Sequence, residues 1–249
     1  YEGNSPFLLS EPKNLTNPIF NAELVTDIPA TFVADPFVIK RADLYYMFFE
    51  ALNANSRQGD IAYATSTDLK SWQYQKVILD EDFHLSYPLV FTWENEYYMI
   101  PETHADLSVR LYKATDFPVK WKFVTKLISG YHFVDNTIFR AKNKWWMFVS
   151  SESNDLLNLY YSENLTSGWK AHSMNPIVKL NKHMSRPSGK VFEFENNLYR
   201  LAQDDYPSYG IQVHAFRIDE LTDSTYNEQL ILKPIIKATG INWNSAGMH

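Results

Sequence analysis

A sixteen-residue pattern that the chain repeats four times constrains its fold more than any other feature. The first copy, DPFVIKRADLYYMFFE, occupies residues 35–50. Each copy has an apolar run, a polar turn containing Asn or Asp, and a second apolar or aromatic run, which is the pattern of a β-hairpin. The later copies are YPLVFTWENEYYMIPE (87–102), DNTIFRAKNKWWMFVS (135–150) and SGKVFEFENNLYRLAQ (188–203). The pattern predicts one structural unit, built on a hairpin and written four times.

The spacing of the copies indicates what that unit is. They begin at residues 35, 87, 135 and 188, and a period of about 50 residues with short strands is typical of the four-stranded blades of a β-propeller. After each of the first three hairpins, an alternating strand leads through a short polar turn to Trp72, Trp121 or Trp169 and a further strand. Tyr226 stands near the Trp position of the fourth copy. Four complete blades are therefore predicted.

A fifth start falls near residue 240, where INWNSAGMH supplies a single strand. The other strands of this blade must come from the N-terminal stretch, and NPIFNAELV, residues 17–25, is the candidate. The two ends of the chain would then close the ring together and leave no unpaired strand edge. We predict an all-β, five-bladed propeller whose fifth blade is closed by N- and C-terminal strands. A chain cut short at its C-terminus is the alternative.

The remaining features of the sequence fit a single domain, residues 1–249. An all-β domain of this length is ordinary, and no Pro/Gly/Ser linker, charge block or low-complexity segment marks a boundary. Aromatic residues, which strands favour, make up 16% of the chain. No run approaches the ~18 apolar residues of a membrane span.

Composition also narrows the classes of partner. Without Cys, the chain can form no disulfide or thiolate metal site. The net charge of −6 disfavours nucleic acid and anionic membranes, which bind basic surfaces. No ligand spacing specifies a metal, and we predict no cofactor. No signal-peptide pattern is visible, but the sequence begins at Tyr1 rather than Met, so both extracytoplasmic and cytoplasmic locations are compatible with it.

The hairpin geometry predicts where polar side chains gather. The first strand of a blade lines the channel and the second runs antiparallel to it, so the first and last residues of each copy should lie at the same channel mouth. This mouth collects Asp35, Tyr87, Asp135 and Ser188 from the starts, and Glu50, Glu102, Ser150 and Gln203 from the ends. Four of these eight are carboxylates. Like charges around one opening repel, which a purely structural design would avoid.

Structural interpretations of the acids stay open. Asp35 and Asp135 each precede a residue that suits a turn. Glu50 and Glu102 also fit solvated positions on the rim. Their joint placement is what favours a functional role.

Loops around the hairpins add further polar groups. His84, in DFHLSYP before the second hairpin, is equally compatible with a structural role. Arg186, in SRPSG before the fourth, either pairs with one of the acids or holds a substrate carboxylate, phosphate or sulfate by a bidentate contact. His104, in PETHADL, is a weaker candidate. We predict substrate-binding roles for His84, Tyr87, Arg186, Ser188, Gln203, Asp204, Tyr209 and His249.

Several of these segments resemble known families. The start ADPF, with FFE and GDIAYATSTDLKSW, resembles the first blade of the five-bladed propeller glycosidases, the arabinanase and xylosidase group with its invertase and levansucrase relatives. The resemblance implies an Asp opening blade one as base or nucleophile, an Asp opening blade three that tunes the acid, and a blade-four Glu as general acid. Asp35 and Asp135 match the first two positions. Blade four departs from the pattern, because Arg186 and Ser188 stand where the acid is expected.

A closer resemblance is to the propeller-like N-terminal domain of plant glucosamine inositolphosphorylceramide transferases and related bacterial proteins, some attached to formyltransferase-like domains. The similar segments are NPIF, FVADPF, FFE, GDIAYATS, FHLSYPLVF, YYMIPE, LYKATDFPVKW, VDNTIF, LYRLAQD and YG. They extend over nearly the whole chain from Asn17 onward. This resemblance implies a fused or associated transferase domain as a partner.

Three functions are compatible with the sequence. The first is a glycosidase or transglycosylase, in which Glu102 is the predicted acid with Glu50 behind it, Asp35 the base, and Asp135 a group that holds the acid or a sugar hydroxyl. The second is a noncatalytic module that binds or positions a glycan for a glycosyltransferase or formyltransferase. The third is a structural or protein-interaction propeller. The first two predict a carbohydrate or glycoconjugate ligand, anionic ones included.

Overall fold

A computed structural model describes residues 1–245 and 247 of the chain. Contacts within the chain divide it into two compact units. The first unit, Leu15–Phe133, contains repeats one and two, and the second unit, Tyr1–Asn14 with the chain from Val134 onward, contains repeats three and four. Of the helices in the described residues, none has the length and apolar character needed to span a membrane.

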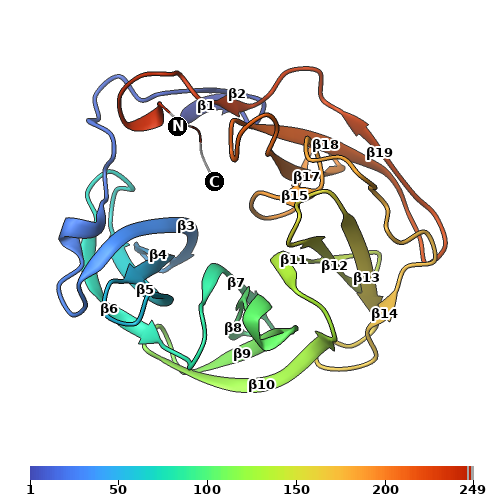
Figure 1. The fold of residues 1–249 in the computed structure, drawn as a ribbon, viewed down its shortest axis with the longest axis horizontal. Helices are drawn as coiled ribbons and strands as arrows, with labels where there is room; N and C mark the ends of the chain where they lie inside the picture. The colour runs from blue at the N-terminus through green and yellow to red at the C-terminus, as the bar shows by residue number, and fades with distance from the viewer. Residues whose placement is uncertain (246, 248–249) are drawn as a thin grey trace. The chain divides into compact units, whose positions relative to one another are not determined.

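The first unit consists of two four-stranded antiparallel sheets (Figure 1). One has the order β3–β4–β5–β6, with β3 at Ala30–Arg41, β4 at Leu44–Asn53, β5 at Gln58–Ser66 and β6 at Gln73–Leu79. The other contains β7 at Ser86–Trp93, β8 at Glu96–Glu102, β9 at Ser108–Asp116 and β10 at Lys120–Ser129. Short 3-10 helices occur at Ala22–Leu24 (η1) and His104–Asp106 (η2). In both sheets each strand pairs with its neighbour in sequence, as in a propeller blade.

The second unit repeats this arrangement. Its first sheet contains β11 at Phe133–Ala141, β12 at Lys144–Ser151, β13 at Leu157–Ser162 and β14 at Lys170–Ala171. Its second contains β15 at Arg186–Pro187, β16 at Phe192–Phe194, β17 at Asn197–Asp204, β18 at Gln212–Leu221 and β19 at Tyr226–Leu230, with β20 at Ile236–Lys237 paired to β18. Strands β1 (Glu2–Ser5) and β2 (Leu8–Ser10) form a separate two-stranded sheet, and η3 lies at Asn242–Asn244.

The predicted all-β propeller fold is confirmed, since each of the four repeats forms one sheet of four or more strands. The fifth blade differs from the prediction, because the described residues contain no fifth sheet of that size. Residues 17–25, expected to supply strands, contain only η1. The side chain of Asn21 accepts a hydrogen bond from the Glu23 backbone N–H at 3.1 Å and caps this helix, a local interaction that competes with strand pairing. Of the residues described after β20, none lies in a strand, and residues 242–244 are helical.

The two ends of the chain nevertheless contact each other within the second unit. Trp243 Nε1 donates a hydrogen bond to Glu11 Oε1 at 3.1 Å, and Asn244 Nδ2 donates one to the Tyr1 hydroxyl at 2.7 Å. The rings of Tyr1 and Trp243 lie 6.2 Å apart. The N- and C-terminal segments therefore meet through Tyr1, Glu11 and η3, and not through the strands predicted at residues 17–25 and near residue 240.

A β-bulge opens the repeat hairpin in both sheets of the first unit. Ala34 pairs with Glu50 and Phe37 with Phe48, so residues 35 and 36 lie opposite a single residue of β4. Residues 87 and 88 form the same bulge against β8. A bulge leaves one residue outside the ladder, which suits the prolines at positions 36 and 88 because they have no N–H to donate.

The residue that opens each bulge has an uncommon backbone conformation. Asp35 and Tyr87 have φ angles of +54° and +46°, and Asp135, at the same position of the third copy, has +50°. Residues other than Gly keep such angles only where their surroundings enforce them, commonly at functional sites. The hairpin repeat therefore fixes the direction of these three side chains at a cost in backbone energy.

Candidate functional site

Three of the predicted acids lie in the first unit and are buried. Asp35, Glu50 and Glu102 are 5%, 4% and 5% exposed, respectively. Asp35 occupies the bulge of the first hairpin, Glu50 lies within β4, and Glu102 ends β8. The backbone N–H of Tyr87 donates a hydrogen bond to Asp35 Oδ2 at 3.1 Å. The bulge of the second hairpin thus binds the carboxylate of the first.

His84 lies beside Glu50, with its Nε2 3.4 Å from Glu50 Oε1. The backbone N–H of Gly59 donates to His84 Nδ1 at 2.9 Å. Because Nδ1 accepts that bond, a neutral His84 carries its proton on Nε2, facing the carboxylate. Burial lowers the pKa of His84, His104 lowers it further, and Asp35 acts in the opposite direction. His84 is therefore neutral at pH 7.

Gly59 is required by this arrangement. A Cβ at position 59 would lie 2.3 Å from the carbonyl oxygen of Leu85 and 2.7 Å from Glu50 Oε1. The Gly59 carbonyl also accepts a hydrogen bond from the Leu85 N–H at 2.9 Å. The close approach of β5 to the loop before β7 thus holds His84 against Glu50.

A second carboxylate–histidine pair forms around Glu102. His104 Nδ1 lies 2.9 Å from Glu102 Oε1 and must be the donor, because the carboxylate is an acceptor. His132, which the sequence analysis missed, lies 3.2 Å through its Nδ1 from the backbone carbonyl of His104. The ring of His104 is 6.1 Å from that of His84 and 6.0 Å from that of His132. The first unit therefore combines buried carboxylates with three neighbouring imidazoles, a set of groups able to bind hydroxyls or exchange protons.

Asp135 lies in the second unit and is fully buried. Arg186 binds both of its carboxylate oxygens: Nε donates to Oδ2, and Nη2 donates to Oδ1 at 3.3 Å. Arg186 Nη1 donates to Asn154 Oδ1 at 2.9 Å, and its guanidinium lies 5.1 Å from the centre of the Tyr209 ring. Of the two alternatives for Arg186, the structure shows the pair with an acid. The fork geometry and the burial make this a strong, charge-assisted contact.

The fourth repeat places neutral side chains where the first two have glutamates. Gln203 is fully buried, and its Nε2 donates to Asp205 Oδ1 at 2.6 Å. The Gly210 N–H donates to the same Asp205 oxygen at 3.0 Å. Ser188 lies in a wider bulge, where residues 188–191 face only residues 200–201 of β17, and its N–H donates to the Leu201 carbonyl at 3.2 Å.

Asp204, at the end of β17, accepts hydrogen bonds from several side chains. His183 Nδ1 lies 2.9 Å from its Oδ1, and Gln212 Nε2 and His214 Nε2 lie 2.8 and 3.3 Å from its Oδ2. The sequence analysis missed both histidines. The loop position could have revealed His183, because His84 and His183 each stand in the loop that enters a repeat hairpin. His249, also predicted to bind substrate, lies outside the described residues.

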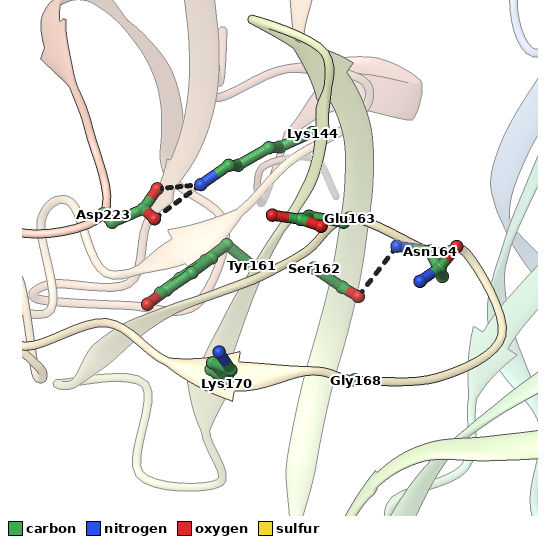
Figure 2. A pocket seen from close by; sticks show the side chains of 8 residues that line it. All are labelled: Lys144, Tyr161, Ser162, Glu163, Asn164, Gly168, Lys170 and Asp223. Atoms are coloured by element: carbon green, nitrogen blue, oxygen red, sulfur yellow. Dashed lines mark hydrogen bonds and ion pairs between the residues drawn. The ribbon is translucent and has the colours of Figure 1, made fainter.

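Two further observations concern metal binding and a groove on the second unit. Among the described residues, no group of three or more His, Asp or Glu side chains has a geometry that could hold a metal ion. A groove of about 220 Å³ on the second unit contains none of the predicted site residues (Figure 2). There Lys144 donates to Asp223, and the Asn164 N–H donates to Ser162 Oγ at 3.1 Å. These bonds pair Lys144 with Asp223 and Ser162 with the backbone of Asn164.

Known proteins resemble the chain in sequence over nearly its whole length. It matches the family described as "Glucosamine inositolphosphorylceramide transferase 1, N-terminal" over residues 10–249. A relative with the name glucosamine inositolphosphorylceramide transferase 1, from Oryza sativa subsp. japonica, is 36% identical over 247 residues, which cover 94% of this chain and 33% of the relative. Its namesake from Arabidopsis thaliana is 33% identical over 250 residues, covering 92% and 32%. The chain thus spans about a third of the length of these relatives.

Solved structures resemble the chain in fold. An exo-β-1,3-galactanase from Clostridium thermocellum superposes with a TM-score of 0.66 at 13% identity, covering 84% of this chain and 51% of that one. At this identity the likeness establishes the shared propeller fold alone.

Proposed function

Because the chain belongs to the glucosamine inositolphosphorylceramide transferase 1 N-terminal family, we propose that it is a noncatalytic propeller module that binds the sugar part of a glycoconjugate. The relatives carry the name of a transferase of which this chain corresponds to about a third. A module of that extent suits the role of positioning an acceptor or donor for a catalytic domain elsewhere in the protein or in a partner.

The observation that carries this proposal is the pairing of Asp135 with Arg186. A propeller glycosidase of the kind the sequence resembles would use this Asp to tune and orient an acid from blade four. In this chain both Asp135 oxygens accept hydrogen bonds from Arg186, and Gln203 occupies the repeat position of Glu50 and Glu102. An aspartate held in this way supports a fixed binding surface better than an acid–base pair.

The buried polar groups supply specificity for sugar hydroxyls. Asp35, Glu50 and Glu102 offer acceptors, and His84 and His104 offer donors and acceptors. Desolvated groups of this kind discriminate strongly, because a ligand that lacks the matching hydroxyl leaves them unpaired. Tyr87, Ser188, Gln203, Asp204 and Tyr209 remain proposed ligand contacts.

A hydrolase or transglycosylase is the second candidate. The buried Glu102, 2.9 Å from His104 Nδ1, favours it, because a carboxyl group that shares a proton with an imidazole could protonate a leaving oxygen. Asp35 would then be the base, Glu50 a second acid, and Asp135 a substrate-orienting residue.

Calorimetry and product analysis on one panel of ligands separate the two candidates. The probes are glucosamine, myo-inositol phosphate and a set of aryl glycosides, tested with the unmodified chain, Asp35→Asn and Glu102→Gln. Glu96→Gln is the matched control, because Glu96 begins the strand that Glu102 ends, is exposed, and pairs with Lys113. We expect binding without turnover and a loss of affinity of about tenfold or more in Glu102→Gln, as for a hydrogen bond to a charged group. Turnover that disappears in Glu102→Gln would establish the hydrolase, and the absence of any sugar binding would refute both candidates.

We also propose that the chain ends form a reduced fifth blade. Tyr1 and Glu11, which flank strands β1 and β2, contact the segment around Trp243, and propellers typically contain about 4–8 blades, a range that includes five. Deleting residues 1–10 should lower the midpoint of thermal unfolding if these strands stabilise the second unit. An unchanged midpoint would refute this role.

A further inference from the structure

The loop before the fourth hairpin borders a hollow of about 370 Å³ in the second unit. Its walls include Asp155, Asn181, Lys182, His183 and Tyr206. His183 also borders an adjoining hollow of the same volume, which His214 and Phe216 line as well. The imidazole of His183 thus stands between two cavities, and its side chain is 56% exposed.

His183 is held firmly despite this exposure. Its Nδ1 donates to Asp204 Oδ1 at 2.9 Å, and Asp204 is only 2% exposed. Burial alone would raise the pKa of Asp204, but the hydrogen bonds from Gln212 and His183 lower it below its ordinary value. The carboxylate is therefore ionised at neutral pH and fixes the orientation of the ring.

The hydrogen bonds to Asp204 determine which nitrogens remain for a ligand. With Nδ1 as donor, neutral His183 presents Nε2 as an acceptor. His214 uses Nε2 toward Asp204 at 3.3 Å, which makes its Nδ1 the acceptor, and within the described residues this buried Nδ1 has no hydrogen-bond partner. This Nδ1 is closed to a ligand in the hollow, so His183 Nε2 is the imidazole acceptor that the hollow presents.

Hydrogen bonds hold the loop that carries His183 in place. The Asn181 N–H donates to the Asp155 carbonyl at 3.0 Å, and the Asp205 N–H donates to the Lys182 carbonyl at 2.9 Å. The His183 N–H donates to Asn181 Oδ1 at 3.0 Å. A ligand would therefore bind without the entropic cost of ordering this segment.

Tyr206 supplies an apolar surface beside these polar groups. Its side chain is largely exposed, and its ring lies 5.4 Å from that of His183 at 69°. An exposed aromatic ring next to fixed acceptors and a lysine matches the two faces of a sugar, whose C–H groups are apolar and whose hydroxyls donate and accept. Lys182 adds a donor and Asp155 an acceptor.

We infer that the hollows on either side of His183 form a second sugar-binding subsite, which takes one pyranose ring through His183 Nε2 and the ring of Tyr206, with His214 lining the adjoining wall. The inference rests on the proposed function, because the ligand is the same class of glycoconjugate. A second sugar unit of that ligand would bind in the second unit, without contacting the acids of the first unit.

Histidine-labelled NMR spectra and calorimetry test this subsite with glucosamine and methyl β-galactoside as probes. His183→Asn is the informative variant, because its amide still donates to Asp204 but lacks the Nε2 acceptor. Tyr206→Ala removes the apolar surface, and Tyr131→Ala is its control, a tyrosine of the first unit with comparable exposure. We expect sugar to shift the His183 and His214 signals, and each of the two subsite variants to weaken that binding about tenfold. Tyr131→Ala should bind like the unmodified chain.

The outcomes distinguish this inference from the function it rests on. If sugar binds and Glu102→Gln weakens it while His183→Asn and Tyr206→Ala leave it unchanged, the subsite is refuted and the proposed function stands. If the subsite variants alone weaken binding, the subsite stands and the site in the first unit is refuted. If the unmodified chain binds neither sugar, both are refuted.

Discussion

The two units place different chemistry on the same hairpin repeat. In the first unit the ends of the hairpins are Glu50 and Glu102, each beside a histidine. In the second unit the corresponding positions are Ser150 and Gln203, and the buried acid at a hairpin start, Asp135, is bound by an arginine. At these hairpin positions, the first unit therefore holds Glu50 and Glu102 against partners that titrate, and the second unit holds Asp135 against a permanent cation.

The two kinds of partner differ in whether their protonation can change. A histidine can gain or lose a proton near neutral pH, whereas an arginine stays charged. The carboxylates of the first unit can thus change their hydrogen-bonding role when a ligand binds. The Asp135–Arg186 pair can only be kept or broken, which suggests that it supports the second unit's hairpins while the first unit's groups respond to a ligand.

The largest effect should come from breaking that pair. Arg186→Met keeps much of the side-chain volume but leaves Asp135 as a buried charge, and we expect the free energy of unfolding to fall by about 3–5 kcal/mol. Glu102→Gln in the first unit should cost less, because the amide oxygen still accepts from His104. Denaturant unfolding of the two variants measures both values.

The double variant Asp135→Asn/Arg186→Met sharpens this result. It should be less destabilised than the sum of its single variants, since no uncompensated charge remains. A loss below about 1 kcal/mol in Arg186→Met, or strict additivity in the double variant, would contradict the assignment of this pair as the fixed element of the second unit.

The sequence predicted the sheets of both units because their information is local. Alternating apolar residues and the turns at residues 42–43, 94–95, 142–143 and 195–196 specify hairpins without long-range contacts. The bulges at Asp35 and Tyr87 depend on pairing register, which a polar residue before a proline suggests but does not fix. The strands predicted at residues 17–25 are absent for a different local reason: the segment has strand-like composition, but the cap at Asn21 stabilises a helical turn instead.

The side chains that pair with the buried carboxylates were harder to predict than the carboxylates themselves. Asp135 and Arg186 are 51 residues apart, and both interpretations of Arg186 fitted the sequence because only the fold decides which groups meet. His132 and His183 carry no motif of their own. Loop position alone points to His183, and it became identifiable only once the end of β17 placed Asp204 beside it.

Gly59→Ala should break the site of the first unit with a smaller loss of stability. The added methyl would meet the Leu85 carbonyl and Glu50 Oε1, and overpacking of this kind costs about 1–3 kcal/mol. Sugar binding should fall as well, because His84 loses its place beside Glu50. Gly130→Ala is the control: it has open space and a φ of +106°, so it should strain the backbone without affecting binding. Equal losses of binding in both variants would show that Gly59 does not position His84.

The smallest expected effect is on the pKa of His84. Its titration distinguishes a histidine partner in the first unit from Arg186, which stays charged, in the second. Burial and the neighbouring His104 lower its pKa, so the folded protein binds this proton less readily than the unfolded chain, whose histidines titrate near about 6.5. The stability contributed by neutral His84 is therefore fully present above that pH and is lost as the pH falls below it toward the folded-state pKa.

His104→Gln should raise the pKa of His84, and Asp35→Asn should lower it, because these residues act on it in opposite directions. NMR titration of the histidine ring protons measures both shifts, with the second-unit histidines as internal references. A His84 that titrates above about 6.5, or that ignores both substitutions, would mean that its proton is not coupled to the buried carboxylates.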